Sequence, residues 1–536
     1  MTGQVEIPML AVDGAWDELL QRPDALAALL PAFLQGRRWF GGKARHIAAA
    51  RIIEAVRIPY ADAVAYLCLV QVDYRDGAAE TYALPIAGAS VERASALLHA
   101  LPHLAIARLQ RPGQGEAVVL HDALGEPAFC TALLELIGTN RQLHGRMGVL
   151  LGSSTRAFAR IAGGTQLQPA IGRAEQSNTS VIYGDRLILK LFRRLEAGIN
   201  PDLEIGRFLT EQRAFAHIPP VAGAIEYRRG TDEPTTVAIL QEFVPNQGDA
   251  WQYTLGALDQ ALARASTLEA QPIAPLSSRT LLNLAAQEPP PAARELIGPY
   301  RDSARLLGQR TAELHLALAA DPNDPDFAPE PFTAAYQRAI YESMRHLAAQ
   351  VFQTFRADPQ WGQAYPVPDL EQQVLERFQP VRDRPIAATR IRFHGDYHLG
   401  QVLYTGRDFL IIDFEGEPAR PLSERRAKHS PLRDVAGMLR SFHYAAYAAL
   451  RVRRDRARLE PWARCWTQWV SAGFVKAYLT TAGQASFVPR SRDELQVLLD
   501  AYLLEKAIYE LGYELNNRPD WVPIPLQGIL QLIAPA

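Results

Sequence analysis

The stretch that most constrains the fold runs from 392 to 418 and reads RFHGDYHLGQVLYTGRDFLIIDFEGEP. It contains a short apolar run, FLII, which is followed at once by Asp413. Such a run predicts a buried strand that carries an acid at its carboxyl end. A second acid, Asp396, stands upstream in an HGD sequence beside Gly395. The stretch therefore predicts a loop acid and a strand-end acid in one fold.

These residues occur in the order that phosphoryl transfer from a nucleotide requires. Asp396 is expected to orient and deprotonate an attacking hydroxyl. Gln401 and Asp413 are expected to hold Mg²⁺ against the phosphates of ATP. Isolated Asp and His residues in loops more often cap helices or close turns. The ordered set nevertheless matches the catalytic loop and the metal loop of kinase-like folds, which favours a catalytic role.

The motifs HGDYHLGQVL, IDFEGEP and ERRAKHSPLRDVAGMLRSF closely resemble those of the maltokinases, bacterial members of the aminoglycoside-phosphotransferase-like kinases. The resemblance extends from a GRRWFGGKAR segment near the amino terminus to an EKAIYELGYE segment near the carboxyl terminus. It implies an α+β, bilobal, protein-kinase-like fold. We expect an N-terminal cap subdomain over 1–125, a kinase N-lobe over 126–245 and a mostly helical C-lobe over 246–536.

Length and charge agree with this class of protein. A chain of 536 residues is too long for one ordinary core, so two to three packed units are expected. A net charge of -2 offers no field that would gather nucleic acid or an anionic membrane. No run approaches the roughly 18 consecutive apolar residues of a membrane span. Three widely separated cysteines and the absence of a signal peptide favour a cytoplasmic location with reduced thiols.

A predicted strand that ends in Lys190 is the first candidate nucleotide element. On spacing alone, such a lysine is more often a solvated edge residue. Glu204 follows on a helix that Asn200 can cap and Pro201 can begin. The pair resembles the lysine–glutamate ion pair that positions nucleotide phosphates in kinases. Lys190 would contact the α- and β-phosphates, and Glu204 would orient it.

Two further segments are expected at the nucleotide. The polar stretch before the strand lacks the glycines that cover phosphates in protein kinases, so its side chains are expected to close over the nucleotide instead. These residues are Ser177, Asn178, Thr179 and Ser180. A later strand is expected to form the hinge between the lobes and to face the adenine. Its residues are Gln241, Glu242, Phe243 and Val244. A plain edge strand stopped by proline is an equally good interpretation of that segment.

A helix near the carboxyl terminus is the candidate acceptor surface. At about 100° per residue, its apolar side chains share one face and its polar ones the opposite face. Half exposure of the helix is the commoner interpretation of such a pattern. Carbohydrates, however, rest their C–H faces on aromatic rings and need paired donors and acceptors for their hydroxyls. The expected sugar contacts are Lys506, Tyr509, Glu510 and Tyr513.

Two residues near the catalytic stretch complete the predicted site. His398 would lie near the reacting hydroxyl. Asp434 falls in the first turn of a predicted helix, where a carboxylate suits the helix dipole. In kinase-like folds an acid in this place supports the backbone of the catalytic loop, so we assign that role to Asp434.

The resemblance implies ATP-dependent phosphorylation of maltose at its anomeric hydroxyl, which gives maltose 1-phosphate on the route from trehalose to α-glucan (glycogen). It often implies a physical partnership with trehalose synthase, although no residue identifies the contact surface. One alternative is a kinase for another sugar or aminosugar, such as glucosamine. Another is a nucleotide-binding scaffold without activity, which the presence of Lys190, Asp396 and Asp413 disfavours. ADP release with and without maltose separates these alternatives.

Overall fold

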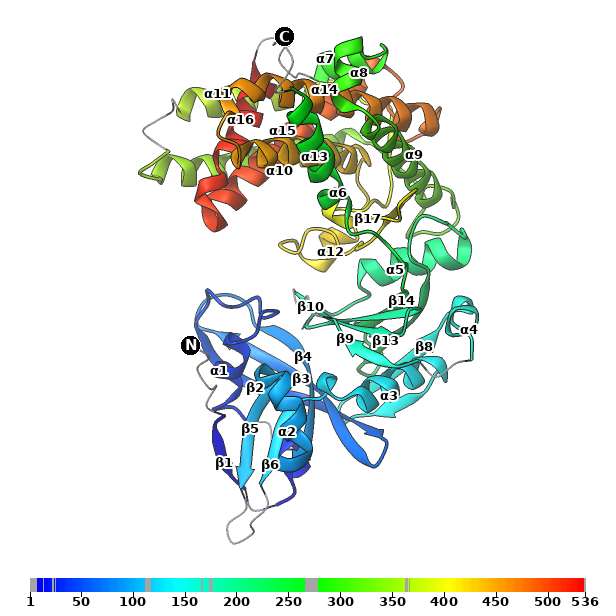
Figure 1. Cartoon of the computed structure of the whole chain (residues 1–536), viewed down its shortest axis with the longest axis vertical. Coiled ribbons are helices and arrows are strands. Elements are labelled where there is room, and N and C mark those ends of the chain that lie inside the picture. The colour runs from blue at the N-terminus through cyan, green and yellow to red at the C-terminus, as the bar shows by residue number, and fades with distance from the viewer. Residues whose placement is uncertain are drawn as a thin grey trace. The chain divides into compact units, whose positions relative to one another are not determined.

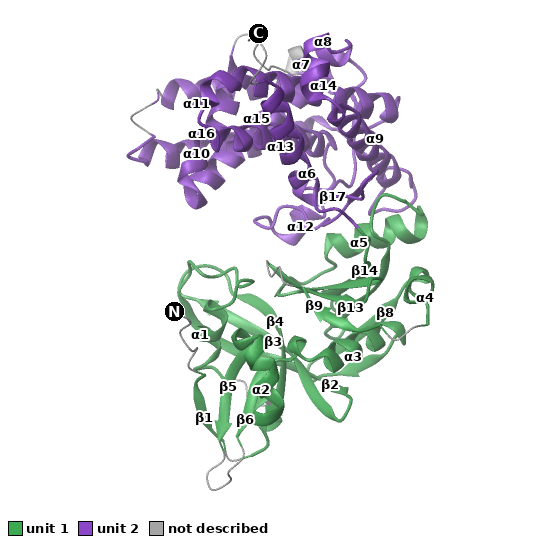
Figure 2. Cartoon of the chain, viewed as in Figure 1, with its two compact units in different colours: residues 1–245 green, residues 246–536 purple. Residues whose placement is uncertain are grey.

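A computed structural model describes residues 7–534 except 13, 22–23, 25, 111–116, 165–166, 173–176, 266–277, 362–364 and 366. The chain divides into two compact units, residues 1–245 and 246–536 (Figure 2). The first unit is built mainly on two β-sheets, and the second is mainly helical (Figure 1).

The first sheet of the first unit has seven strands in the order β1-β5-β6-β4-β3-β2, with β12 paired to β4. The strands are β1 (Met9–Ala11), β2 (Ile47–Tyr60), β3 (Ala63–Tyr74), β4 (Glu80–Ser90), β5 (Ala105–Gln110), β6 (Val118–Asp122) and β12 (Arg194–Leu195). Helix α1 (Leu30–Gln35) precedes β2. Helix α2 (Val91–Ala100) follows β4 and is capped by Ser90, whose side chain accepts a hydrogen bond from the Arg93 amide.

The second sheet is antiparallel throughout and has the order β7-β8-β13-β14-β11-β10-β9. The strands are β7 (Gln142–His144), β8 (Val149–Ser154), β9 (Pro169–Ile171), β10 (Asn178–Tyr183), β11 (Leu187–Phe192), β13 (Val221–Arg228) and β14 (Thr235–Glu242). The unit also contains α3 (Pro127–Gly138), α4 (Arg156–Ala162) and α5 (Pro201–Arg207). Helix α5 begins as its sequence predicts, because Asn200 caps it and Pro201 occupies its first turn.

The two sheets of the first unit share one apolar core. Val56 and Leu67 of the first sheet belong to the same buried cluster as Val181 and Leu189 of the second sheet and Phe129 of α3. Continuous packing of this kind stabilises both sheets together. The two sheets therefore form one folded body.

The second unit consists of helices and two small two-stranded sheets. The helices are α6 (Ala250–Ala265), α7 (Ser278–Ala285), α8 (Pro291–Ile297), α9 (Tyr300–Leu318), α10 (Ala334–Ala357), α11 (Val367–Asp383), α12 (Leu422–Arg425), α13 (Leu432–Arg451), α14 (Arg456–Ala482), α15 (Arg492–Asn517) and α16 (Pro523–Ile533). Strand β15 (Glu330–Pro331) pairs with β16 (Thr389–Arg390), and β17 (Val402–Tyr404) pairs with β18 (Phe409–Ile411). Among the residues searched, no helix is long and apolar enough to cross a bilayer.

Helix α13 is the central element of the second unit. It packs against α6, α14 and α15, and most of its residues are buried on every side. A helix that is buried on nearly every side lies in the interior of its unit, and its buried polar residues, such as Asp434 and Arg440, need partners there. Its first turn and one face of α15 are thereby fixed next to the loop between β16 and β17.

Candidate active site

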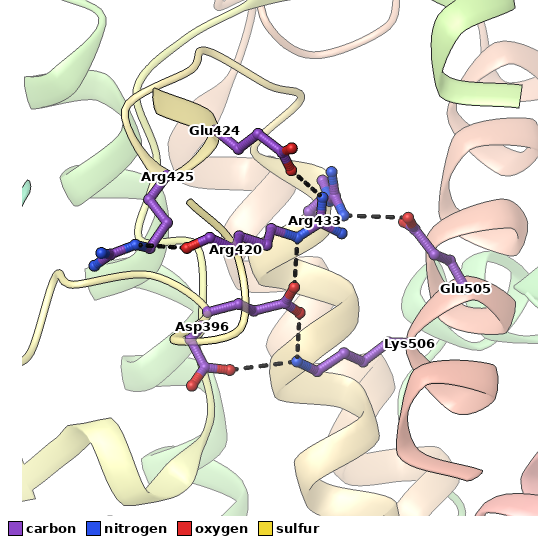
Figure 3. Close-up of polar contacts among 8 residues, drawn as sticks. Asp396, Arg420, Glu424, Arg425, Arg433, Glu505 and Lys506 are labelled. Carbon is purple, nitrogen blue, oxygen red and sulfur yellow. Dashed lines mark hydrogen bonds and ion pairs between the residues drawn. The ribbon is translucent and has the colours of Figure 1, made fainter. Parts of the chain in front are cut away.

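The loop that carries Asp396 requires a glycine before that residue. Gly395 has a φ of +88°, which favours glycine, and a Cβ added there would lie 3.1 Å from the Gly416 Cα. The absence of a side chain therefore lets the loop run close to the segment that follows β18. Asp396 is held between that segment and α15 (Figure 3).

Asp434, buried in the first turn of α13, holds the backbone of this loop. Its Oδ2 accepts a hydrogen bond of 2.7 Å from the His394 amide, and its Oδ1 accepts one of 3.0 Å from the Gly395 amide. His315 Nε2 lies 3.0 Å from the same Oδ2. His394 in turn donates from Nε2 to the Ile412 carbonyl at 2.9 Å. The loop is thus tied both to α13, as we expected for Asp434, and to the residue before Asp413.

Asp396 lies among charged and polar side chains in a narrow cavity of the second unit. Lys506 Nζ, from α15, is 3.3 Å from Asp396 Oδ1 and 3.3 Å from Glu417 Oε1. His398 Nε2 is 3.7 Å from Asp396 Oδ2. Because His398 Nδ1 accepts a hydrogen bond from the Gly400 amide, Nε2 carries the proton of the neutral ring. Nε2 is thus the His398 nitrogen that lies near the Asp396 carboxylate.

The charges around Asp396 keep it ionised. Burial raises the pKa of Asp396, but the charge of Lys506 and the nearby His398 ring lower it more, so the pKa lies well below its usual value. Burial lowers the pKa of Lys506, but Asp396 and Glu417 raise it above the usual value. At neutral pH the cavity therefore holds an ammonium group between two carboxylates.

Four further charged residues that the sequence analysis did not select belong to this cavity. Glu417 bonds Arg420 at 2.7 Å, and Arg433 of α13 bonds Glu505 of α15 at 3.2 Å (Figure 3). Together they line the space beside Asp396. Glu417 stands in the EGEP sequence right after the strand-end acid, and this was the available signal. No periodic pattern marks Arg420 or Arg433.

The predicted sugar contacts on α15 separate into two groups. Lys506 and Tyr509 line the cavity, with Lys506 Nζ 4.7 Å from the centre of the Tyr509 ring. The prediction for Glu510 needs correction, because its carboxylate accepts two hydrogen bonds from Arg440, at 2.6 and 3.0 Å. It joins α15 to α13 instead of lining the cavity. Tyr513 is 47% exposed, and its role stays a prediction.

The two predicted magnesium ligands lie at one end of the β17–β18 hairpin. The Ile412 amide donates to the Gln401 carbonyl at 3.0 Å, which brings Gln401 opposite the residue before Asp413. Asp413 has a φ of +68°, a left-handed conformation that costs about 1–3 kcal/mol outside glycine and occurs often at functional sites. A carboxylate oxygen of Glu415 lies within 4.8 Å of one of Asp413. Such carboxylate and amide oxygens fit Mg²⁺, and their role as its ligands stays a prediction.

In the first unit, Lys190 of β11 points at a buried acid. Its Nζ lies 3.2 Å from Oδ2 of Asp202, which stands in the first turn of α5 and is 1% exposed. The sequence analysis selected Glu204 on the same helix and missed Asp202. The orienting role of Glu204 stays a prediction. A strand lysine beside a helix acid is the arrangement that holds nucleotide phosphates in kinases.

Of the four polar residues predicted to cover the nucleotide, Ser177 to Ser180, the prediction is wrong for the Thr179 side chain. In the β10–β11 pair, Thr179 stands opposite Leu191, whereas Ser180 stands opposite Lys190. Opposed residues of antiparallel strands share a face and neighbours along a strand alternate, so Thr179 faces away from Lys190. Its buried hydroxyl accepts a hydrogen bond from Arg193 Nε at 2.8 Å. Ser177, Asn178 and Ser180 remain predicted nucleotide contacts.

The predicted hinge residues lie at the end of β14. Gln241 is paired within the sheet opposite Ile188, and the strand ends at Glu242. The Glu242 amide donates to the Pro220 carbonyl at 2.9 Å, and the Phe243 amide donates to the Arg186 carbonyl at 2.7 Å. These two amides are therefore engaged within the unit and do not offer a free donor to an adenine edge. Contact of the segment, which includes Val244, with the nucleotide stays a prediction.

The chain is similar to a family of cap domains and to two glucosamine kinases. Residues 33–126 match the maltokinase N-terminal cap domain, which confirms the resemblance over that segment. The glucosamine kinase of Streptacidiphilus jiangxiensis is 24% identical over 368 residues, which cover 67% of this chain and 72% of the relative. The glucosamine kinase of Mycolicibacterium smegmatis (strain ATCC 700084 / mc(2)155) is 25% identical over 432 residues, which cover 77% of this chain and 87% of the relative.

Solved structures show the same fold over nearly the whole chain. A glucosamine kinase in complex with glucosamine, ADP and inorganic phosphate aligns with a TM-score of 0.60 and 18% identity, covering 97% of this chain and 99% of that one. Crystal form B of a glucosamine kinase aligns with a TM-score of 0.62 and 19% identity, covering 96% of this chain and 100% of that one. The predicted α+β, kinase-like fold with a cap is confirmed.

Proposed function

We propose that this chain is an ATP-dependent sugar kinase that phosphorylates maltose at its anomeric hydroxyl to give maltose 1-phosphate. One observation carries the proposal. Asp396 is an ionised, partly buried carboxylate on a loop whose backbone is fixed by Asp434, and it opens onto a polar cavity with an aromatic wall at Tyr509. The relation to glucosamine kinases supports a sugar as the acceptor.

In the proposed reaction the acceptor hydroxyl donates a hydrogen bond to Asp396. A carboxylate with a lowered pKa is a weak base, so it takes the proton late, as the bond to phosphorus forms. A positioned base of this kind contributes about 10²–10⁴ in rate. His398 and Lys506 hold the carboxylate in place from two sides. Gln401 and Asp413 would hold Mg²⁺, whose charge neutralises the phosphates, and Lys190 would bind the α- and β-phosphates.

The charge of Lys506 favours a neutral acceptor over an aminosugar. Its ammonium lies 3.3 Å from a carboxylate oxygen of Asp396 and 3.3 Å from one of Glu417, so a protonated sugar amine that approached these oxygens would meet a like charge close by. A neutral sugar needs only hydrogen bonds, which carboxylates, Lys506 and Tyr509 supply. The cap match favours the same choice, because the matched domain is that of maltokinases. A glucosamine kinase remains the second candidate, and the names of the relatives favour it.

Other reactions would supply the maltose and consume the maltose 1-phosphate of the proposed reaction. Maltose 1-phosphate would feed α-glucan synthesis from trehalose, and trehalose synthase would be the partner that supplies maltose. The use of ATP would locate the reaction in the cytoplasm. These statements extend the proposal and rest on the maltose assignment.

An assay of ADP release with no sugar, maltose, glucose and glucosamine tests the proposal. We expect release to depend on maltose and Asp396→Asn to lower turnover at least about 10²-fold. Retention of nucleotide binding by this variant would show that its fold is intact. Asp302→Asn is the matched control, because Asp302 lies on α9 with its side chain 75% exposed, and it should leave turnover unchanged.

Three outcomes would contradict parts of the proposal. Turnover of glucosamine without turnover of maltose would support the second candidate. Nucleotide binding without turnover of any sugar would support the scaffold alternative. Near-normal turnover by Asp396→Asn would remove Asp396 from the role of base.

A further inference from the structure

A cavity of about 690 Å³ lies within the first unit, apart from the Asp396 cavity of the second unit. Its walls come from the turn after α1, the end of α2, the start of α3 and strand β9. Cavities of roughly 300–1,000 Å³ commonly bind small molecules. The space is therefore large enough for a ligand the size of a phosphorylated monosaccharide.

Basic side chains dominate the polar part of this cavity. Arg37, Arg38, His103 and Arg193 line it, and no Asp or Glu is among the described residues that do. The charge of Arg193 is balanced by Asp122 at 2.7 Å. Arg38 is exposed and forms no ion pair with any residue that the structure describes. Because a guanidinium stays charged at all working pH values, the cavity carries positive charge that an anion could balance.

The rest of the wall is apolar. Leu101, Leu104, Leu124 and Ile171 contribute side chains to it. A bare anion would leave this surface in water, whereas a ligand with a compact carbon skeleton would cover it. Arginine recognises phosphate oxygens through its planar fork of donors. We propose that this cavity binds a small phosphate monoester, with the phosphoryl group at Arg38 and His103 and the carbon skeleton against the leucines.

Hydrogen exchange of the full-length protein with glucose 1-phosphate as the probe tests this site. We expect slower exchange of amides in 36–40 and 100–105. The variant Arg38→Ala/His103→Ala should raise the half-saturating concentration of the probe about tenfold or more, because it removes charge-assisted hydrogen bonds. Arg75→Ala, which removes an exposed arginine in the turn after β3 of the same unit, is the control and should retain the protection. Amides in 394–398 report separately on any binding at Asp396.

Each alternative outcome would overturn a stated part of the inference. Protection confined to 394–398 would show that the probe binds only at the Asp396 cavity. Equal protection by inorganic phosphate would remove the role of the apolar wall. Equal protection by glucose would remove the role of the phosphoryl group. Unchanged binding by Arg38→Ala/His103→Ala would exclude these side chains as the anion site. The test does not depend on which sugar the chain phosphorylates.

Discussion

Lys506 shows how a single side chain determines the chemistry of the candidate site. It was selected as a sugar contact on an amphipathic helix, yet its ammonium binds Asp396, 110 residues earlier, and Glu417. Lys506 lowers the pKa of the proposed base Asp396, and Asp396 and Glu417 in turn raise the pKa of Lys506. The residue thus determines both the charge of the cavity and the basicity of Asp396.

The pH dependence of the reaction should report this contact. In the native chain the pKa of Asp396 lies well below its usual value, so kcat/KM should begin to decrease only at a pH below about 4. In Lys506→Gln the burial of Asp396 still raises its pKa, but the ammonium charge that lowered this pKa is gone. The acidic limb should therefore move to higher pH. A pH–rate profile of both proteins measures the shift.

Lys476→Gln provides the control for that profile. Lys476 lies on α14 with its side chain 38% exposed and pairs with Glu288. Its replacement removes a lysine charge from the same unit without touching the cavity, so the limb should not move. Coincident limbs for native protein and Lys506→Gln would contradict the proposed effect of Lys506 on Asp396.

At the scale of elements, the sequence predicted local features well, but it did not predict contacts between distant segments. The apolar run before Asp413 predicted strand β18, and the acid in the first turn of α13 predicted the support of the catalytic loop. Both signals lie within a few residues of sequence. The contact of Lys506 with Asp396 depends on how α15 packs beside a loop, and helical periodicity carries no information on that packing. The face of Thr179 was missed for a related reason, because it depends on strand register.

The approach of α13 to the catalytic loop predicts the effect of a small substitution. A Cβ at Gly437 would lie 2.5 Å from the Tyr397 carbonyl oxygen, so Gly437→Ala must displace the loop or the helix. We expect lower kcat with little change in helix content, because Asp396 follows the displaced backbone. Steady-state kinetics and circular dichroism measure the two effects.

Gly473→Ala is the matched control within a helix. The nearest side-chain atom to a Cβ at that position of α14 is Arg305 Cγ at 3.7 Å, an ordinary contact. Alanine is the better helix former by about 0.5–1 kcal/mol, so this variant should be active and slightly more stable. Equal activity of Gly437→Ala and Gly473→Ala would show that the loop tolerates the displacement.

At the scale of the whole molecule, the first unit is stabilised as one body. Its two sheets share an apolar core, and Arg193 joins them through Asp122 at the end of β6 and Thr179 in β10. The sequence resemblance predicted a cap before a kinase N-lobe; the match at 33–126 confirms the cap, and the bounds of the N-lobe stay a prediction. The resemblance did not predict that their buried side chains would mix, because motifs describe conserved segments and not the packing between them.

The buried ion pair predicts unequal effects of two neighbouring substitutions. Arg193 and Asp122 are 0% and 1% exposed, so Arg193→Ala leaves a buried carboxylate uncompensated and should lower the free energy of unfolding by about 3–5 kcal/mol. The Arg194 side chain is 47% exposed and lies 3.6 Å from Glu80, so Arg194→Ala should cost at most about 1 kcal/mol. Urea denaturation measures both. Equal destabilisation would contradict the assigned role of Arg193.

Removal of the first 125 residues should unfold the second sheet. A chain truncated to 126–536 loses Val56 and Leu67, and this loss exposes the apolar side chains of β10 and β11. We expect amides in 178–192 to exchange rapidly in the truncated chain and slowly in the complete one. The helices of the second unit have their own contacts and should stay protected in both. Slow exchange of 178–192 after truncation would show that the second sheet folds alone.

The ammonium group between two carboxylates also has a consequence for inhibitor discovery. Compounds aimed at the Asp396 cavity must compete with Lys506 for the same oxygen atoms, and a basic amine would have to expel that side chain first. Uncharged polyols that can stack a C–H face on the Tyr509 ring avoid this competition. A fragment library enriched in neutral polyols should therefore yield more hits than one enriched in amines.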